Sequence, residues 1–446
     1  MLACAASVVF APIARAQGES LVRDTEIEAI LHEEADPVFK AAGLNPRDVK
    51  LHLVGQNILQ AAATPGQNML IYTGLIQETK NPNQLIGVIA HETGHIAGGH
   101  MVRSGEMEKA GLKPFLLTMG LGILAAAAGA PDAAAVLMGS ASQFGTLGML
   151  GYSREQEARA DQAAITYLQK ANISSKGLVD FFDNFRYEEV FSEARRFPFF
   201  QSHPISSERI ELLRRRAEEQ PAYDKVDSPE ALAKHAIMKA KLDAFMNPPG
   251  LTLAKYKESD TGYPARYARA IAHYKALDTA LAIRDIDALL VDQPTNPYLW
   301  ELKGQVLFES GRPKEAEAPH RRSVELMPDA PLLRVNLAQT LIAQNDKAKT
   351  DDAINVLEGA LAVEGDNTFA WRLMAQARDS KGENGAARLA AAEEHFSVGD
   401  MTQARIFAMR ARELLPKNTP EWRRATDIVL VAEPSKDDLK AIGGNG

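Results

Sequence analysis

The chain has 446 residues, of which 46% are hydrophobic and 24% charged, so it can bury sizeable cores in two or three domains. Its formal net charge of -8 argues against a nucleic acid as partner. The only cysteine, Cys4, lies close to the N-terminus, so neither a disulfide framework nor a thiolate metal site is predicted.

Residues 1–16 have the pattern of a secretory signal peptide. An apolar stretch ends in the small-residue sequence Ala14-Arg15-Ala16, although no basic residues precede it. Cleavage after Ala16 would remove Cys4 from the mature protein. Cys4 also follows Leu2-Ala3, which faintly resembles a lipidation site, but it lies very near the start of the chain.

The run His91-Glu92-Thr93-Gly94-His95 is an H-E-x-x-H motif. Residues four apart leave the same face of an α-helix, so His91 and His95 can hold one Zn²⁺ while Glu92 accepts a proton from the attacking water. Residues 83–90 predict a buried helix with Asn83 as its N-cap. Two histidines at this spacing can also simply be packed in a core, so the third ligand is decisive.

Two candidates for the third ligand follow the motif. His100 is one residue short of the metzincin spacing and would point about 140° away from His95 on a continued helix, so we expect it at the surface or at a helix cap. A gluzincin instead takes a glutamate from a second helix. Glu157 and Asp161, four residues apart, provide a metal ligand and an acceptor for a ligand imidazole. Glu155 lies about 200° away from Glu157 and is the alternative ligand.

These motifs, with Ser202-His203-Pro204 and Arg209, resemble the gluzincin peptidases that include HtpX and the CAAX prenyl endopeptidases, and within them the periplasmic, repeat-bearing BepA type. The resemblance covers residues 20–215, and the repeats extend it to most of the chain. It implies that His203 lies near the metal, where it plugs the fourth coordination position or assists the transition state. Loop capping before Pro204 is the alternative.

The same resemblance extends to residues 70–75, which match the strand and turn before the metal helix. It implies that this strand is a sheet edge to which an extended substrate can pair. Between the two zinc motifs, residues 115–138 form two apolar stretches separated by Pro131-Asp132, each too short to span a bilayer. We expect two short helices that either form a core hairpin or contact a membrane face.

The C-terminal half has a helix-turn-helix rhythm that follows a polar bridge. One helix is predicted near 229–246, and a tetratricopeptide unit is recognisable from Trp300 to Pro328. Neighbouring units begin near Pro264, Pro331 and Asn367, and a degenerate unit follows them. Trp300 and its counterpart Trp371 are expected to pack within the repeats rather than to bind a ligand.

We therefore predict a mainly α protein with a small β-sheet, in which a zincin-type metallopeptidase domain precedes an α-solenoid. The predicted parts are a signal peptide (1–16), the peptidase domain (17–216), a helical bridge (217–263), tetratricopeptide repeats (264–430) and a tail (431–446). The predicted site comprises the catalytic Glu92 and His203, the zinc ligands His91, His95 and Glu157, and the supporting Asp161 and Arg209.

The predicted function is that of a zinc metalloendopeptidase with one Zn²⁺ per chain. By the resemblance it is periplasmic, either free or peripheral on the outer membrane, and it degrades misfolded or stalled envelope proteins. The repeats would dock these clients or an outer-membrane assembly machine. The alternative is a chaperone or assembly scaffold whose zinc site is structural or latent. Glu92 favours the peptidase, because a structural zinc site needs no general base.

Overall fold

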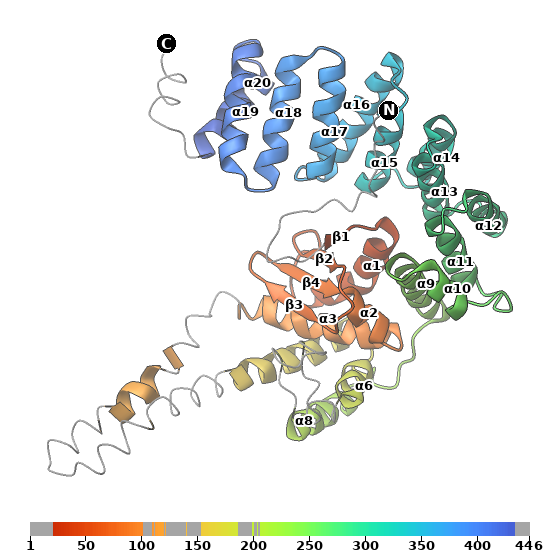
Figure 1. The fold of residues 1–446 in the computed structure, drawn as a ribbon. Helices are drawn as coiled ribbons and strands as arrows, with labels where there is room; N and C mark the ends of the chain where they lie inside the picture. The colour runs from red at the N-terminus through yellow and green to blue at the C-terminus, as the bar shows by residue number, and fades with distance from the viewer. Residues whose placement is uncertain are drawn as a thin grey trace. The chain divides into compact units, whose positions relative to one another are not determined.

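The computed structural model divides into two compact units (Figure 1). The first is Glu28–Lys239, and the second joins Met1–Ile27 to Ala240–Gly446. The structure describes residues 21–100, 109–110, 112–119, 121, 140, 153–185, 199, 203 and 206–432. The predicted signal peptide, most of the apolar stretch 115–138 and nearly all of the tail lie outside these residues, whereas 115–119 are helical as expected.

The unit Glu28–Lys239 contains a small sheet in which β2 (Lys50–Val54), β4 (Asn68–Tyr72) and β3 (Ala61–Thr64) follow one another. β4 pairs in parallel with β2 and antiparallel with β3. The expectation that the strand in 70–75 is a sheet edge is therefore wrong. The turn between β3 and β4 has positive φ at Gly66 and Gln67, which folds β3 back along β4 and leaves β3 at the edge.

Helix α3 (Pro82–Ala97) carries the H-E-x-x-H motif and follows α2 (Thr73–Glu78). Its N-cap is Asn81 and not Asn83 as predicted, because the Asn81 side chain accepts a hydrogen bond from the Gln84 amide and Pro82 occupies the first helical position. Asn83 has a different role. Its side chain donates to the Ser174 carbonyl and accepts from the Gly177 amide, which ties α3 to the start of α6 (Lys176–Asn184).

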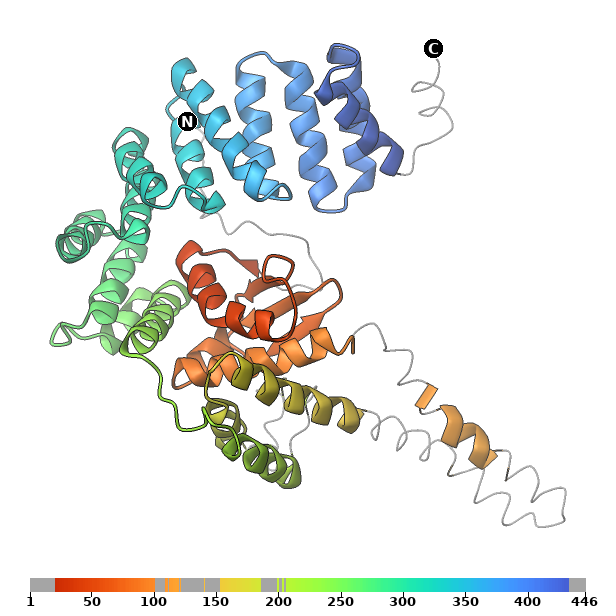
Figure 2. The ribbon, with the colours of Figure 1, turned by 180° about the vertical axis from the view of Figure 1, so that it is seen from behind.

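Two glycines allow other helices to lie directly on the backbone of α3. A Cβ at Gly94 would stand 2.8 Å from the Ala160 carbonyl oxygen, and a Cβ at Gly87 would stand 2.7 Å from the Leu178 amide nitrogen. Ala160 belongs to the helix of residues 153–170, and Leu178 belongs to α6. The helix that carries Glu157 thus reaches the motif because the motif itself contains a glycine (Figure 2).

Three further helices belong wholly or mainly to this unit. They are α1 (Thr25–Ala41), α8 (Ser207–Glu218) and α9 (Pro229–Met246), of which α1 and α9 each have one end in the other unit. The bounds of α9 confirm the helix predicted near 229–246. No helix in the described part of the chain is long and apolar enough to cross a bilayer.

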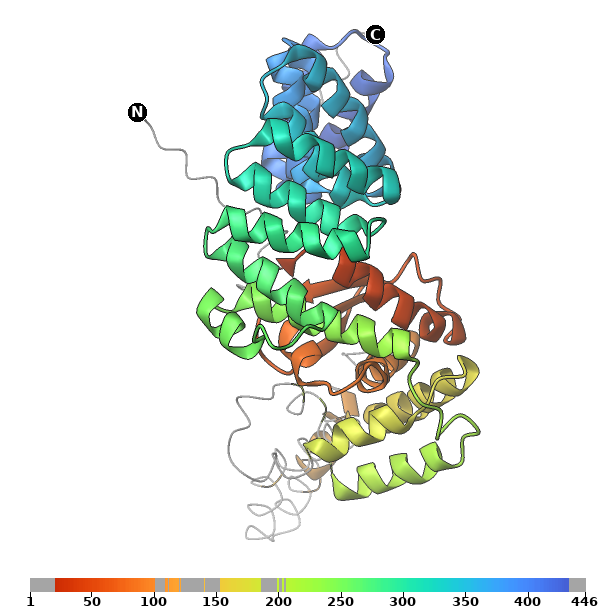
Figure 3. The ribbon, with the colours of Figure 1, turned by 90° about the vertical axis from the view of Figure 1, so that its right-hand side faces the viewer.

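The second unit is a run of antiparallel helix pairs that share continuous apolar cores (Figure 3). The predicted starts near Pro264, Pro331 and Asn367 agree with α11, α15 and α17. Its helices are α10 (Pro249–Lys255), α11 (Tyr263–Lys275), α12 (Thr279–Asp292), α13 (Pro297–Glu309), α14 (Pro313–Leu326), α15 (Pro331–Ile342), α16 (Lys347–Val363), α17 (Thr368–Ser380), α18 (Asn384–Ser397), α19 (Met401–Leu414) and α20 (Pro420–Val431).

Equivalent positions in the repeats make the same contact. The indole nitrogen of Trp300 donates to the Pro294 carbonyl, and that of Trp371 donates to the Gly365 carbonyl, six residues earlier in both cases. Both bonds join the first helix of a pair to the turn before it, and Trp371 also packs against the buried core of its repeats. The packing predicted for Trp371 is thus confirmed, and Trp300 makes the equivalent hydrogen bond.

The N-terminal residues belong to the repeat unit through buried charges. The Lys241 ammonium group lies 2.9 Å from Oδ1 of Asp24 and 3.1 Å from Oε2 of Glu26, and the Tyr267 hydroxyl donates to the same Glu26 oxygen. Burial lowers the pKa of Lys241, but Asp24 and Glu26 outweigh it and raise that pKa well above its ordinary value. Strand β1 (Leu21–Val22) directly precedes this cluster.

Candidate metal centre

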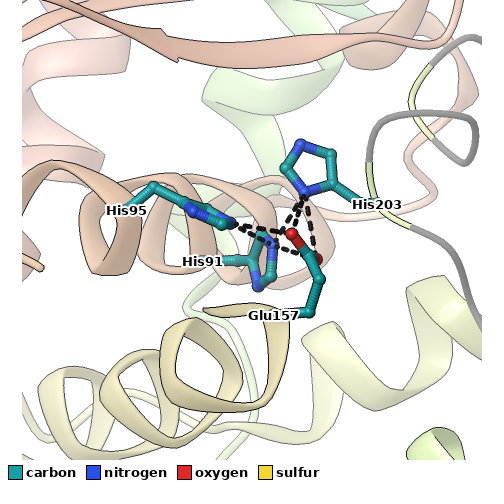
Figure 4. Close-up of side chains that lie close together, drawn as sticks. All are labelled: His91, His95, Glu157 and His203. Carbon is teal, nitrogen blue, oxygen red and sulfur yellow. Dashed lines mark hydrogen bonds and ion pairs between the residues drawn. The ribbon is translucent and has the colours of Figure 1, made fainter. Parts of the chain in front are cut away.

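Four side chains converge in the interior of the unit Glu28–Lys239. His91 and His95 come from one face of α3, Glu157 from the helix 153–170, and His203 from the segment before α8 (Figure 4). All four are buried, and one ligand atom from each lies within 4.8 Å of the other three. The spacing of the two motifs therefore has the predicted consequence, since two helices far apart in the sequence meet at one point.

The donor atoms face a common centre. Nε2 of His91 and Nε2 of His95 lie 3.2 Å apart, and each lies 3.4 Å from a carboxylate oxygen of Glu157. Nδ1 of His203 lies 3.1 Å from both oxygens of Glu157 and 3.3 Å from Nε2 of His91. Three imidazoles and one carboxylate that present lone pairs to one buried point are a donor set suited to a metal ion.

Asp161 and Arg209 lie directly behind the ligands. Oδ1 of Asp161 is 2.9 Å from Nδ1 of His91, the ring nitrogen that faces away from the centre. The Arg209 guanidinium donates to both oxygens of Asp161, lies 3.1 Å from Oε2 of Glu157 and is placed over the Phe182 ring. These contacts put both residues where they were predicted, in support of His91 and Glu157.

The charges of this group follow from its neighbours. Burial raises the pKa of Asp161, but Arg209 and His91 outweigh it and lower that pKa to about 2. Burial likewise raises the pKa of Glu157, and the close imidazoles of His203, His91 and His95 outweigh it and bring that pKa well below its usual range. Burial lowers the pKa of His95. Both carboxylates are thus held in the charged form, Glu157 facing the centre and Asp161 facing Arg209 and His91.

Glu92 lies next to the cluster with one oxygen held and the other available. Its Oε2 accepts a hydrogen bond from the Ala63 amide of β3 at 2.8 Å. Its Oε1 makes no hydrogen bond among the described residues and stands 3.3 Å from Nε2 of His203. A buried carboxylate with one available oxygen beside a metal site can accept a proton from a water molecule held there.

The two alternative ligands have distinct positions. Glu155 is on the solvent side of its helix, where its side chain is 58% exposed and pairs with Arg159. We expected His100 at the surface or at a helix cap. The surface position is wrong, because His100 is only 6% exposed, whereas the cap is confirmed, because the His100 amide donates to the His95 carbonyl at the end of α3. Nδ1 of His100 lies 2.9 Å from Nδ1 of His95. His100 does not point about 140° away from His95, because α3 ends at Ala97 and the chain turns back at Gly99.

An aromatic layer lies beside the cluster. The rings of Phe182 and Phe199 are fully buried, stack on each other and stand edge-on to His91. Phe199 also packs against the His203 ring, and its carbonyl accepts a hydrogen bond from the His203 amide at 2.8 Å. Aromatic side chains exclude bulk water from this side of the centre and strengthen the electrostatic interactions within it.

Several residues near the centre were not assigned from the sequence. They are Phe182, Phe199 and Ala63. Ala63 contributes only its backbone amide, and a backbone contact leaves no signal in residue type. The two phenylalanines carry no signal either, because an aromatic residue beside a metal site has the same sequence pattern as one in any apolar core.

Comparison with known proteins agrees with this geometry. Residues 23–217 match the model of peptidase family M48. The beta-barrel assembly-enhancing protease of Yersinia pestis is 26% identical, over 79% of this chain and 72% of the relative. A putative beta-barrel assembly-enhancing protease of Vibrio cholerae is 25% identical, over 87% of this chain and 81% of the relative. The metalloprotease YcaL of Escherichia coli is 30% identical, over 40% of this chain and 67% of the relative.

The first two relatives match far more of the chain than residues 23–217, so their similarity extends into the helical repeats. One explanation accounts for the converging ligands, for the available carboxylate oxygen of Glu92 and for these matches. The chain belongs to peptidase family M48 and is a BepA-like metalloendopeptidase.

Proposed function

We propose that the chain is a zinc endopeptidase of the cell envelope that degrades misfolded or stalled proteins, outer-membrane proteins among them. The observation that carries this proposal is the position of Glu92, buried beside His91, His95 and Glu157 with its Oε1 available. The names of the relatives, which refer to β-barrel assembly, support the envelope setting. The apolar N-terminal stretch supports export to the periplasm.

Zinc is the metal that we propose, held by His91, His95 and Glu157. Two imidazoles and a carboxylate are the donor set of catalytic zinc in this kind of motif, and no thiolate is needed. A bound zinc ion would polarise the scissile carbonyl and make water a better nucleophile at neutral pH. Glu92 and the backbone of Ala63 provide the general base and its support. Oε1 of Glu92 accepts the proton of the attacking water, while the Ala63 amide keeps Oε2 in place.

The substrate would pair with β3. The Tyr72 amide donates to the Gln60 carbonyl just before β3, so in the antiparallel register every second residue of β3 bonds to β4. Ala61 and Ala63 therefore turn their backbone groups to the other side, where the Ala63 amide meets Glu92. An extended peptide that adds to this edge would have its backbone next to the base, which favours unfolded chains over folded proteins as substrates.

His203 is proposed to restrain the enzyme. Its Nδ1 is among the four converging donor atoms, and its Nε2 is 3.3 Å from Glu92. In this position the ring fills the place that water and substrate need, so a client has to displace it before hydrolysis. The alternative role of His203 is to stabilise the oxyanion that forms during attack. That role would require the same ring to stay beside the substrate carbonyl.

The helical repeats are proposed to be tetratricopeptide units that dock clients or an outer-membrane assembly machine. Within the repeat unit, a cavity of about 190 Å³ is lined by polar and aromatic side chains, including Tyr298, Asn336 and Phe369. Such a mixture suits a peptide whose backbone needs hydrogen bonds and whose side chains need apolar contact. Exposed Leu116 and Leu117, in the described part of the apolar stretch, support a peripheral membrane contact.

The second candidate function is a chaperone or assembly scaffold with a structural or latent metal site. The helical repeats favour it, since stacked repeats offer an extended surface for partners. It differs from the peptidase in one respect: Glu92 would have no role in it. A substitution at Glu92 therefore separates the two functions.

The experiment that tests the proposed function compares wild-type protein with Glu92→Gln. We expect the purified wild-type chain to cleave an unfolded outer-membrane β-barrel protein, and Glu92→Gln to bind zinc and fold normally but to leave the substrate intact. Glu155→Gln, on the exposed face of its helix, is the matched control and should cleave normally. In cells, stalled outer-membrane proteins should accumulate with Glu92→Gln. Cleavage by Glu92→Gln at the wild-type rate would refute the role of Glu92 as the base.

A further inference from the structure

The two residues after α3 bring the chain back over the end of the helix. Gly98 is the C-cap, and Gly99 has a φ of +64°, in the left-handed region that glycine adopts without strain. The amide of His100 then donates to the His95 carbonyl at 3.1 Å. As a result His100 does not continue the helix but folds back beside His95.

Gly98 leaves the room that the His100 ring occupies. A Cβ at Gly98 would lie 2.6 Å from Nε2 and 2.9 Å from Cδ2 of His100. The buried ring is thus held between the end of α3 and the His95 ring. Gly98 and Gly99 together allow the His100 ring to lie beside His95. Larger side chains at 98 and 99 would collide with this ring or strain the turn.

The contact between His100 and His95 involves the ring nitrogens that face away from the metal centre. Their Nδ1 atoms are 2.9 Å apart, and the rings meet edge to face. A hydrogen bond between two ring nitrogens needs one proton on one of them. Nε2 of His95 faces Glu157 and must be without a proton to bind a metal. Nδ1 of His95 therefore carries the proton and donates the hydrogen bond, and Nδ1 of His100 accepts this hydrogen bond.

We propose that His100 is a positioning residue that fixes the tautomer and the ring orientation of His95, as Asp161 does for His91. This inference rests on the proposed assignment of His95 as a metal ligand. The two partners differ in kind, because Asp161 presents a carboxylate oxygen to His91 whereas His100 presents a ring nitrogen to His95. Outer partners of this kind typically contribute a factor of about 10 to 100 in metal affinity.

The test measures zinc affinity of the full chain by competition with a chelator. His100→Phe keeps an aromatic ring but has no acceptor, and we expect it to bind zinc about 10- to 100-fold more weakly than wild type. His100→Asn places an oxygen near the position of Nδ1 and should recover most of that loss. Thr93→Val is the matched control: it removes a buried hydroxyl that donates to the Ile89 carbonyl of the same helix, and it should not change the affinity.

A second readout does not depend on activity or on a variant that folds. In ¹⁵N spectra of the zinc-loaded wild-type protein, a scalar coupling across the hydrogen bond should join Nδ1 of His95 to Nδ1 of His100, with the proton on His95. A protonated Nδ1 on His100, or the absence of this coupling, would overturn the proposal. So would equal zinc affinity in wild type, His100→Phe and His100→Asn.

These outcomes differ from a failure of the metal site itself. If the wild-type protein binds no zinc, the proposed ligand assignment fails and the role of His100 fails with it. If the wild-type protein binds zinc and His100→Phe binds it equally well, only the role of His100 fails. If His100→Phe does not fold, the coupling in the wild-type protein decides.

Discussion

At the scale of single residues, His203 is the side chain with two competing roles. It lies 3.1 Å from a Glu157 oxygen and 3.3 Å from a Glu92 oxygen, so it touches a predicted ligand and the predicted base at once. Substitution of this ring therefore distinguishes restraint of the enzyme from assistance to the reaction.

We expect His203→Ala to raise basal cleavage of casein, because the place that water and substrate need is then open. His32→Ala, which removes a partly exposed histidine of the same unit that pairs with Asp36, is the control and should leave the rate unchanged. If cleavage falls by a factor of about 10²–10³ instead, His203 acts as an oxyanion donor. An unchanged rate would mean that the residue only caps its loop.

The residues of the site differ in how well the sequence predicts them. His91, His95, Glu157 and Asp161 are predicted because each pair is four residues apart on a regular helix, where spacing determines the face. The burial of the His100 ring beside His95 is not predicted, because it depends on where the helix ends and on the left-handed backbone at the turn that follows. The prediction of the N-cap residue of α3 is wrong for a related reason. Pro82 starts the helix earlier than predicted, so the residue before it, Asn81, is the N-cap.

At the scale of elements, the centre depends on two helices that touch at Gly94. The contact places the Ala160 backbone against α3, about one turn after Glu157 and directly before Asp161. The glycine is thus part of the metal site, although its side chain has no donor. Because motif spacing concerns one helix at a time, this contact could not be predicted from the sequence.

We expect Gly94→Ala to reduce zinc affinity by at least about tenfold, because the new Cβ would push away the helix that carries Glu157 and Asp161. Gly87→Ala is the matched control: it lies on the same helix and collides equally closely, but with Leu178 of α6. It should cost stability, about 1–3 kcal/mol, and leave zinc affinity unchanged. Equal affinities for both variants would show that the contact at Gly94 does not position the ligands.

The buried charges around Lys241 lead to a prediction about stability. Lys241→Met removes the cation that faces Asp24 and Glu26, and an unpaired buried carboxylate typically costs about 3–5 kcal/mol. We therefore expect a loss of that size in the free energy of unfolding, measured by denaturant titration. Arg322→Met, which breaks an exposed pair with Glu325, is the control and should cost about 0–1 kcal/mol. A loss in Lys241→Met no larger than in the control would contradict the buried pairing.

At the scale of the whole molecule, the helical repeats and the peptidase fold were predictable to different extents. Repeats recur at a regular period, so the starts of α11, α15 and α17 could be predicted from the sequence. Pairing in the sheet could not, since the position of β3 beside β4 depends on one turn with positive φ at Gly66 and Gln67. The membership of Glu26 in the repeat unit depends on its contact with Lys241, 215 residues away in the sequence.

The central claim concerns the identity of the ligands, and the metal content of the purified full-length chain tests it most directly. We predict about one zinc ion per chain in the wild-type protein by elemental analysis, with zinc lost in His91→Ala and Glu157→Ala and retained in Glu155→Ala. Full zinc content in Glu157→Ala, or loss of zinc in Glu155→Ala, would contradict this ligand assignment.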